Sequence, residues 1–235
     1  MYQYHLLGKS GQKTGRIELV NMLDTSVIRV LSILLAVGTF SRFGILAFFT
    51  RKRQDLGSVR ASKPTGFVLY QVWLFLDFLL PLIFYLLGAT LTGLVYGTPL
   101  NLSFAGAEFL QVVSVPLFLS SIILNGMAYQ ALRQLMRPHI EVMEKHELVT
   151  RGPYSRIRHP TYTGILLMFL ACTLPFLNIV LVVGFLAILG IAYKKTVLEE
   201  ELLSSEEGFG QAYRDYMLKT GRFLPRLRKP KPTAD

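Results

Sequence analysis

The stretch HELVTRGPYSRIRHPTYTG, residues 146–164, combines side chains that bind anions with aromatic rings directly before a long apolar run. Pro160 falls where a helix is expected to begin, since proline is favoured at the first helical position. The free backbone N–H groups of such a helix end attract anions. Arg158 adds a planar cation suited to a carboxylate or phosphate, and Tyr154 and Tyr162 add rings with hydroxyl groups. The same residues would also suit an ordinary membrane flank, where Arg contacts headgroups and Tyr lies in the aromatic belt.

A second polar group follows the apolar run, at Glu199, Glu200 and Glu201. The run 164–193 is too long for one comfortable span, and LPFLN at its centre contains the turn-forming Pro175 and Asn178. We therefore expect a helical hairpin with one arm at about 162–174 and the other from about 177 into the glutamates. Because a hairpin returns to the side where it began, the glutamates should lie near Arg158 and His159. S-adenosylmethionine, which carries a carboxylate, an ammonium, a sulfonium and an adenine, is one ligand among several that suit such a pocket.

The elements that must position these groups are membrane helices. The chain of 235 residues is 51% hydrophobic and 17% charged, with a mean hydropathy of +0.42, which indicates an integral membrane protein. Further apolar runs at about 27–49, 66–96 and 109–129 are long enough to span a bilayer. The expected fold is an all-α integral membrane protein with about five transmembrane helices, the last two forming the hairpin.

The net charge of +10 comes from Lys and Arg clusters beside apolar runs, which headgroups and the positive-inside rule explain better than nucleic acid does. Residues 97–108 contain no Lys or Arg, whereas basic residues follow the first and third apolar runs, at Arg51, Lys52, Arg53, Arg60 and Lys63 and at Arg133, Arg137 and Lys145. This pattern places residues 146–164 on the cytoplasmic side, although it leaves the N-terminal segment, with Lys9, Lys13, Arg16 and Arg29, opposite. We expect no nucleic-acid partner and no metal site.

Two charged residues, Arg42 and Asp77, lie within predicted spans, where an ionisable group is a functional-site hypothesis by default. Pairing with each other or snorkelling is the simpler expectation, so neither is included in the predicted site. Near the C-terminus, Phe209, Ala212, Tyr213, Tyr216 and Met217 form one apolar face of a predicted amphipathic helix. This helix could cover the polar pocket or anchor the chain at the membrane surface.

Over about 145–225, the 146–164 motif, the hairpin, EEELL, FGQAYRDY and FLP together resemble the C-terminal half of the isoprenylcysteine carboxyl methyltransferases and related phospholipid methyltransferases. The resemblance implies a cytoplasmic-side pocket for S-adenosylmethionine in residues 137–235, with S-adenosylhomocysteine as product. Residues 1–136, with about three spans, would bear on the acceptor. The implied catalytic residues are Arg158 and Glu201. The implied cofactor-binding residues are His146, Leu148, Val149, Gly152, Tyr154, His159, Pro160, Tyr162 and Glu200. Which of the three glutamates is the functional acid stays open.

The function implied by the resemblance is in-line methyl transfer to a lipid-like acceptor, most simply the C-terminal carboxylate of a prenylated cysteine, with positioning and exclusion of water dominating. A carboxylate acceptor needs no general base, whereas a phospholipid amine or small thiol would need a proton acceptor such as Glu201. Two further alternatives are an NADPH-dependent enzyme similar to the sterol reductases and a non-enzymatic channel or scaffold. The first is disfavoured by the small number of spans, and the second by the gathering of polar groups at one face.

Overall fold

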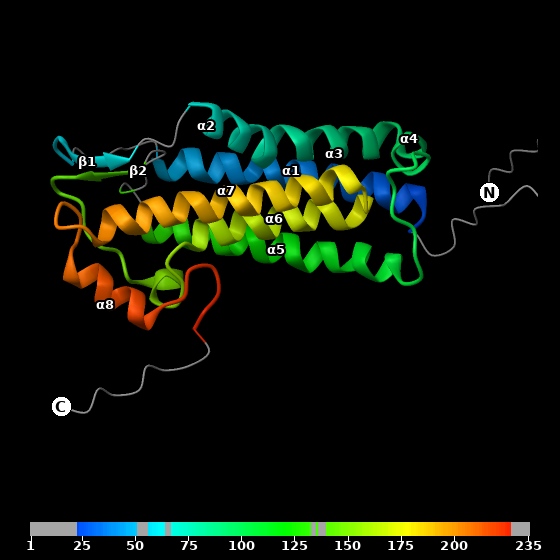
Figure 1. Ribbon diagram of the computed structural model, residues 1–235. Coiled ribbons are helices and arrows are strands. Elements are labelled where there is room, and N and C mark those ends of the chain that lie inside the picture. The colour runs from blue at the N-terminus through cyan, green and yellow to red at the C-terminus, as the bar shows by residue number, and fades with distance from the viewer. Residues whose placement is uncertain (1–22, 51–55, 64–66, 133–134, 136–139, 227–235) are drawn as a thin grey trace, which may run out of the picture.

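The computed structural model describes residues 23–50, 56–63, 67–132, 135 and 140–226. Several basic residues that carry the predicted orientation lie outside these residues, namely Lys9, Lys13, Arg16, Arg51, Lys52, Arg53, Arg133 and Arg137. Within them, one short apolar helix, α6 (Pro160–Phe176), accompanies four candidate membrane spans, which are Thr25–Phe48, Val68–Thr90, Ala107–Leu132 and Ile179–Ser204. These helices run side by side in one bundle (Figure 1). The expected all-α membrane fold is confirmed.

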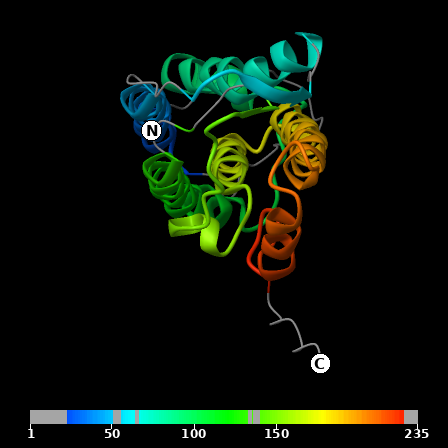
Figure 2. The same ribbon diagram turned by 90° about the vertical axis from the view of Figure 1, so that its left-hand side faces the viewer.

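The outward faces of α1 (Thr25–Thr50), α5 (Ala107–Leu132) and α7 (Ile179–Ser204) are apolar. Leu34 on α1, Ile123 on α5 and Leu186 on α7 are each at least 60% exposed. Large exposed apolar side chains along whole helices suit contact with lipid chains rather than water. Seen along the bundle in Figure 2, α6 occupies the middle of the group, and most of its side chains are buried.

The second span is built from α2 (Phe67–Leu74), a π-helical turn η1 (Phe75–Leu79) and α3 (Leu80–Thr90). Pro81 has no N–H to donate to the carbonyl of Asp77 four residues earlier, which favours a wider turn at this point. The helix then breaks at Leu91, whose backbone leaves the helical region, and restarts as the short α4 (Thr92–Tyr96). The predicted apolar run 66–96 is therefore one span followed by a separate turn.

The hairpin predicted at LPFLN is confirmed, with α6 and α7 as its arms. Leu177 adopts a left-handed conformation with φ of 44°. The side-chain oxygen of Asn178 then caps α7 by accepting the N–H of Val180 at 3.0 Å. Gln111 of α5 donates to the carbonyl oxygen of Pro175 at 2.8 Å. These bonds satisfy polar backbone groups of the turn at an apolar end of the bundle.

The opposite end of the bundle carries the polar elements (Figure 1). They are β1 (Val59–Lys63), β2 (Ile140–Met143), the 3₁₀ turn η3 (Gly152–Ser155) and α8 (Gln211–Lys219). β1 and β2 pair antiparallel, with Lys63 opposite Ile140, a short sheet that the sequence analysis did not predict. The sheet lies on α7, because Ile140 and Val142 are buried in one cluster with Leu202.

Candidate functional site

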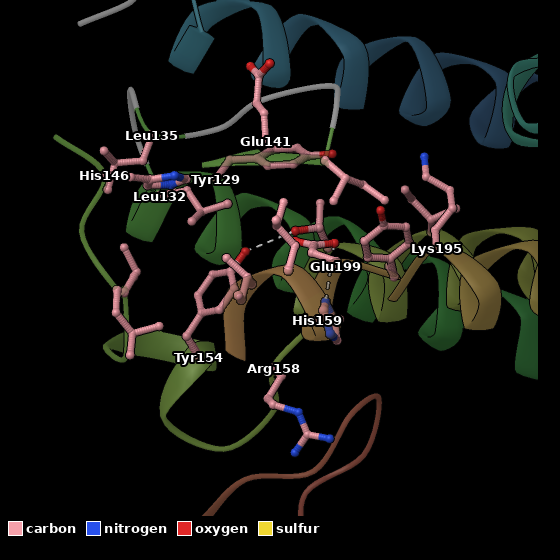
Figure 3. A pocket seen from close by; sticks show the side chains of 18 of the residues that line it. Tyr129, Leu132, Leu135, Glu141, His146, Tyr154, Arg158, His159, Lys195 and Glu199 are labelled. Atoms are coloured by element: carbon pink, nitrogen blue, oxygen red, sulfur yellow. Dashed lines mark hydrogen bonds and ion pairs between the residues drawn. The ribbon is translucent and has the colours of Figure 1, made fainter. Parts of the chain in front are cut away.

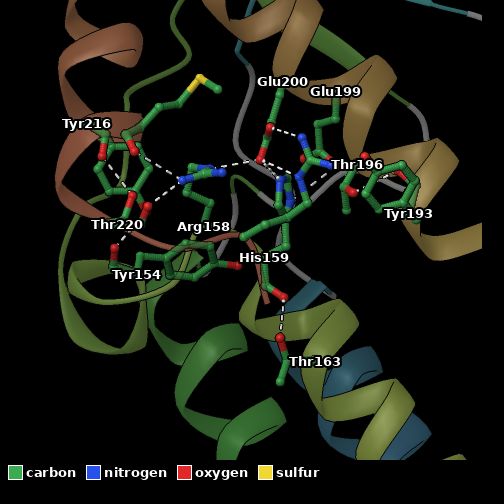
Figure 4. A network of polar contacts seen from close by, with 12 residues as sticks. Tyr154, Arg158, His159, Thr163, Tyr193, Thr196, Glu199, Glu200, Tyr216 and Thr220 are labelled. Carbon is green, nitrogen blue, oxygen red and sulfur yellow. Dashed lines mark hydrogen bonds and ion pairs between the residues drawn. The ribbon is translucent and has the colours of Figure 1, made fainter. Parts of the chain in front are cut away.

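The start of α6 and the end of α7 are joined by a buried ionic cluster, here called the Glu200 hub, which consists of Arg158, His159, Glu200 and Arg222. The carboxylate of Glu200 accepts hydrogen bonds from Nε of Arg158 at 2.7 Å and from Nη2 of Arg222. Nε2 of His159 lies 3.0 Å from the same carboxylate (Figure 4). The hub confirms that the hairpin returns a glutamate to Arg158 and His159. Hydrogen bonding to Glu200 raises the pKa of Arg222, which therefore stays charged.

The segment after α8 is held against the 146–164 motif by backbone and side-chain bonds. The N–H groups of Arg158 and His159 donate to the carbonyl oxygens of Gly221 and Arg222 at 2.8 and 3.1 Å. Arg158 also donates through Nη1 to the carbonyl oxygens of Met217 and Thr220. The motif, α7 and the residues after α8 therefore form one connected structure.

Beside the hub lies a pocket of about 300 Å³. Its outer end is lined by groups at the polar end of the bundle, including His146, Val149, Tyr154 and Tyr213. Its inner end, formed by Arg42, Phe43, Trp73, Asp77 and Lys195, lies within the candidate spans. In Figure 3, Glu199 and His159 lie between His146 on one side and Lys195 on the other. The pocket thus connects the polar end of the bundle with buried charges among the apolar helices.

Most of the sequence-predicted site residues come together at this pocket. Those that line it are His146, Leu148, Val149, Tyr154, Arg158, His159 and Tyr162. Gly152 and Pro160 do not line it but begin η3 and α6, the elements that carry the lining residues Tyr154 and Tyr162. Gly152 begins η3 with φ of 62°, a conformation that glycine adopts without strain. Pro160 is the buried first residue of α6, as expected.

The three glutamates have three different surroundings. Glu199 lines the pocket, and its carboxylate lies 3.8 Å from Nδ1 of His159. Glu200 is bound in the hub, outside the lining, with a side chain only 4% exposed. Glu201 is not brought to the pocket, because its carboxylate pairs with Lys63 and its side chain is 55% exposed. Since successive residues of an α-helix turn by about 100°, three adjacent side chains cannot share one face.

Several charged groups that line the pocket are not among the sequence-predicted site residues. Arg42 and Asp77 pair at 2.8 Å, as expected, but this pair lies in the wall of the pocket. Lys195 also lines the pocket, with its side chain in a buried position of α7. Charges within spans were the available signal, since they are costly in lipid and are retained where they have a function.

Tyrosines supply much of the polar wall at the outer end. The hydroxyl of Tyr154 lies 3.1 Å from Oγ1 of Thr161, and Tyr216 donates to the carbonyl oxygen of Tyr154 at 2.6 Å. Burial raises the pKa of Tyr154 and Tyr213 well above the usual range, and that of Tyr216 to about 12. All three are therefore neutral phenols at physiological pH. Tyr213 and Tyr216 are the buried residues of α8, which places that helix against the pocket.

Comparison with known proteins agrees with this geometry. Residues 109–211 match the phospholipid methyltransferase family model. Two proteins named "Probable protein-S-isoprenylcysteine O-methyltransferase", from Oryza sativa subsp. indica and subsp. japonica, are each 30% identical to the chain over 98 residues. That stretch covers 42% of this chain and 50% of each relative, so the chain matches about half the length of these curated relatives.

The family match runs from α5 to the start of α8 and includes every sequence-predicted site residue, whereas α1 to α4 lie outside it. The order of the motifs in the sequence, the hairpin in the structure and the region matched by the family model all agree with one another. Over this region the chain is similar both to the phospholipid methyltransferases and to the two rice proteins, in agreement with the resemblance seen in the sequence.

Proposed function

We propose that the protein is a membrane-embedded, S-adenosylmethionine-dependent methyltransferase that acts on an amphiphilic acceptor. The observation that carries the proposal is the pocket itself, which joins a polar outer end to an inner end among apolar helices. A charged methyl donor would enter from the polar side, and an acceptor with a long apolar chain would approach between helices. Such a division suits a reaction between a water-soluble and a membrane-bound reactant.

The residues of the pocket fit the donor chemically. A volume of about 300 Å³ lies at the lower end of the range of about 300–1,000 Å³ usual for small-molecule sites. His146, Tyr154 and Tyr162 offer ring faces for the adenine, and Glu199 offers a carboxylate for the ammonium. Leu148 and Val149 belong to the same wall. When bound, S-adenosylmethionine supplies an electrophilic methyl group on its sulfonium.

The placement of the glutamates changes the roles that the resemblance implied. Glu201, predicted beside the methyl transfer, pairs with Lys63 away from the pocket. Glu200, predicted to bind the cofactor, is occupied by Arg158, His159 and Arg222. We therefore assign the ligand-binding carboxylate to Glu199 and a positioning role to Glu200. Arg158, which lines the pocket while bonded to Glu200, holds the start of α6 in place.

The acceptor that we favour is the terminal carboxylate of a prenylated cysteine, in line with the names of the rice relatives. A carboxylate oxygen attacks without losing a proton, so the pocket would only need to align the acceptor and exclude water. The second candidate is a phospholipid amine, which is supported by the family model that matches residues 109–211. An amine must lose a proton, and Glu199 is one carboxylate of the pocket lining that could accept it.

We also propose that the pocket opens on the cytoplasmic side. The segment 97–106 at the opposite end contains no Lys or Arg. At the polar end of the bundle, where the outer end of the pocket lies, the chain carries the basic residues Lys63, Arg151, Arg156 and Arg214. This asymmetry is the one that the positive-inside rule describes.

Ligand binding tests the proposed function directly. The purified protein should bind S-adenosylhomocysteine, and binding of NADPH with no binding of S-adenosylhomocysteine would refute the proposal. A methylation assay with a prenylated cysteine, phosphatidylethanolamine and a small thiol, run in parallel, would then identify the acceptor.

A further inference from the structure

Lys195 presents a buried ammonium group to the inner end of the pocket. The residue is 6% exposed and lies within the span Ile179–Ser204. Its Nζ lies 4.7 Å from the ring centre of Trp73 and 5.6 Å from that of Tyr162. These two rings pack edge to face, with 5.6 Å between their centres. The ammonium is therefore held in a fixed place by an aromatic wall.

The aromatic wall does not satisfy the hydrogen-bonding groups of the ammonium. Cation–π attraction offsets part of the cost of burial, but a lysine ammonium also has three N–H donors. Among the described residues, Lys195 has neither a hydrogen bond from Nζ nor a carboxylate within 4.0 Å. The nearest pocket carboxylate on the same helix, Glu199, lies beside His159 instead. A buried charge without a hydrogen-bonding partner is costly, so this position calls for an anionic ligand.

The charges of the neighbouring Arg42 and Asp77 cancel each other, so the positive charge of Lys195 is not compensated. Arg42 and Asp77 form a buried pair at 2.8 Å, with side chains 3% and 10% exposed. Nε of Arg42 is buried without a hydrogen-bond partner among the described residues, so this cation also has a donor to spare. The inner end as defined here, with two cations and one anion, carries one net positive charge. It is thus matched to a ligand with one negative group.

We propose that Lys195 binds the anionic group of the methyl acceptor, and that the inner end of the pocket is the subsite for the acceptor's polar head. This proposal rests on the proposed function and deepens it. The apolar chain of the acceptor would then extend along Phe43, Leu46 and Leu74, which line the same end of the pocket. Arg42, Trp73 and Asp77 precede the matched region 109–211, so the N-terminal helices would select the acceptor.

A carboxylate of a prenylated cysteine and a phosphate of a phospholipid share the required negative charge, and two pairs of probes separate them. The first pair is N-acetyl-S-farnesylcysteine and its uncharged methyl ester. The second pair is lysophosphatidylethanolamine and a monoacylglycerol with the same acyl chain. Binding of each probe to the full-length protein is measured without any methyl donor, and binding of S-adenosylhomocysteine is measured separately.

The decisive variant is Lys195→Met, which keeps the apolar stem between the rings and removes the charge. We expect it to weaken binding of the charged member of one pair by about tenfold or more, as for loss of a charge-assisted hydrogen bond. The uncharged member and S-adenosylhomocysteine should bind as before. Lys195→Arg should recover most of the affinity. The matched control is Lys194→Met, since Lys194 is the adjacent lysine and is exposed.

The pair that responds identifies the source of the anion. The proposal is overturned if the wild-type protein fails to prefer a charged probe in either pair. It is equally overturned if Lys195→Met leaves that preference intact, or weakens the charged and uncharged probes alike. A different result would separate the two proposals: Lys195→Met selectively loses binding of the charged probe, but the wild-type protein does not bind S-adenosylhomocysteine. That result would refute the methyltransferase function and still support a site for an anionic lipid at Lys195.

Discussion

Arg158 and Glu200, 42 residues apart in the chain, meet through a 2.7 Å hydrogen bond from Nε to the carboxylate, and both side chains are more than nine-tenths buried. This bond joins the start of α6 to the end of α7 on the side of the bundle where the pocket opens. Because Glu200 is fully engaged, its neighbour Glu199 is the member of the cluster left facing the pocket. Two adjacent positions of α7, about 100° apart around the helix, thus carry the proposed positioning residue Glu200 and the proposed ligand-binding residue Glu199.

The first prediction concerns the Glu200 hub. Glu200→Gln removes the negative charge that Arg158 and Arg222 share, which leaves the buried Arg158 and the partly buried Arg222 without compensation. We expect it to lower the free energy of unfolding by about 2–4 kcal/mol and to lower the thermal midpoint in detergent by several degrees. Glu201→Gln is the control, since its exposed pair with Lys63 should contribute less than about 1 kcal/mol. Equal midpoints for the two variants would contradict the hub's structural role.

The second prediction concerns Glu199. Glu199→Gln should weaken binding of S-adenosylhomocysteine by about tenfold, because a charge-assisted bond to the ligand's ammonium is replaced by a neutral one. The thermal midpoint should change little, since the Glu199 side chain is 32% exposed and its ion pair with Nδ1 of His159 is long, at 3.8 Å. Calorimetric titration measures the affinity. Glu201→Gln is the control and should leave the affinity unchanged. An unchanged affinity in Glu199→Gln would contradict the assignment of the ligand-binding carboxylate to Glu199.

The membrane fold could be predicted because its signals are local. Hydropathy marks each span, and Pro175 and Asn178 mark the hairpin within an otherwise unbroken apolar run. Pro160 marks the start of α6 for a similar reason, since its missing N–H is tolerated only at a helix start. The meeting of Arg158 with a glutamate followed from the hairpin alone, and it needed no knowledge of side-chain packing.

What could not be predicted depends on which way each side chain faces. A helix boundary uncertain by one residue turns the side chains by about 100°, which is enough to exchange Glu199 with Glu200, and an uncertainty of two residues would exchange it with Glu201. Lys195 lies beside Lys194 near a helix end, where both look like ordinary interfacial lysines, and only packing against Trp73 sets it apart. The pairing of β1 with β2 joins segments about 80 residues apart and left no signal in either short strand.

The third prediction concerns the buried pair Arg42 and Asp77. Asp77→Asn leaves Arg42 charged and uncompensated at 3% exposure, which should cost about 3–5 kcal/mol of stability. Adding Arg42→Met removes that charge, so the double variant should regain most of the loss. Thermal unfolding of the two single variants, the double variant and the wild type measures the coupling. If the double variant is no more stable than Asp77→Asn alone, the two residues do not act as a pair.

The last prediction concerns the contact between α5 and α6. A Cβ atom built on Gly164 would lie 2.5–2.7 Å from three side-chain atoms of Asn125, too close for any real contact. Gly164→Ala should therefore force the helices apart and lower the free energy of unfolding by about 1–3 kcal/mol. The Asn125 amide is buried without a hydrogen-bond partner among the described residues, so Asn125→Ala sacrifices no such bond. The double variant Asn125→Ala/Gly164→Ala should consequently recover most of the lost stability, as read from thermal midpoints.

Gly126→Ala is the matched control, because nothing lies within 4 Å of its added Cβ, and alanine is favoured over glycine in a helix by about 0.5–1 kcal/mol. A Gly164→Ala variant as stable as Gly126→Ala would mean that α5 and α6 do not meet at this point.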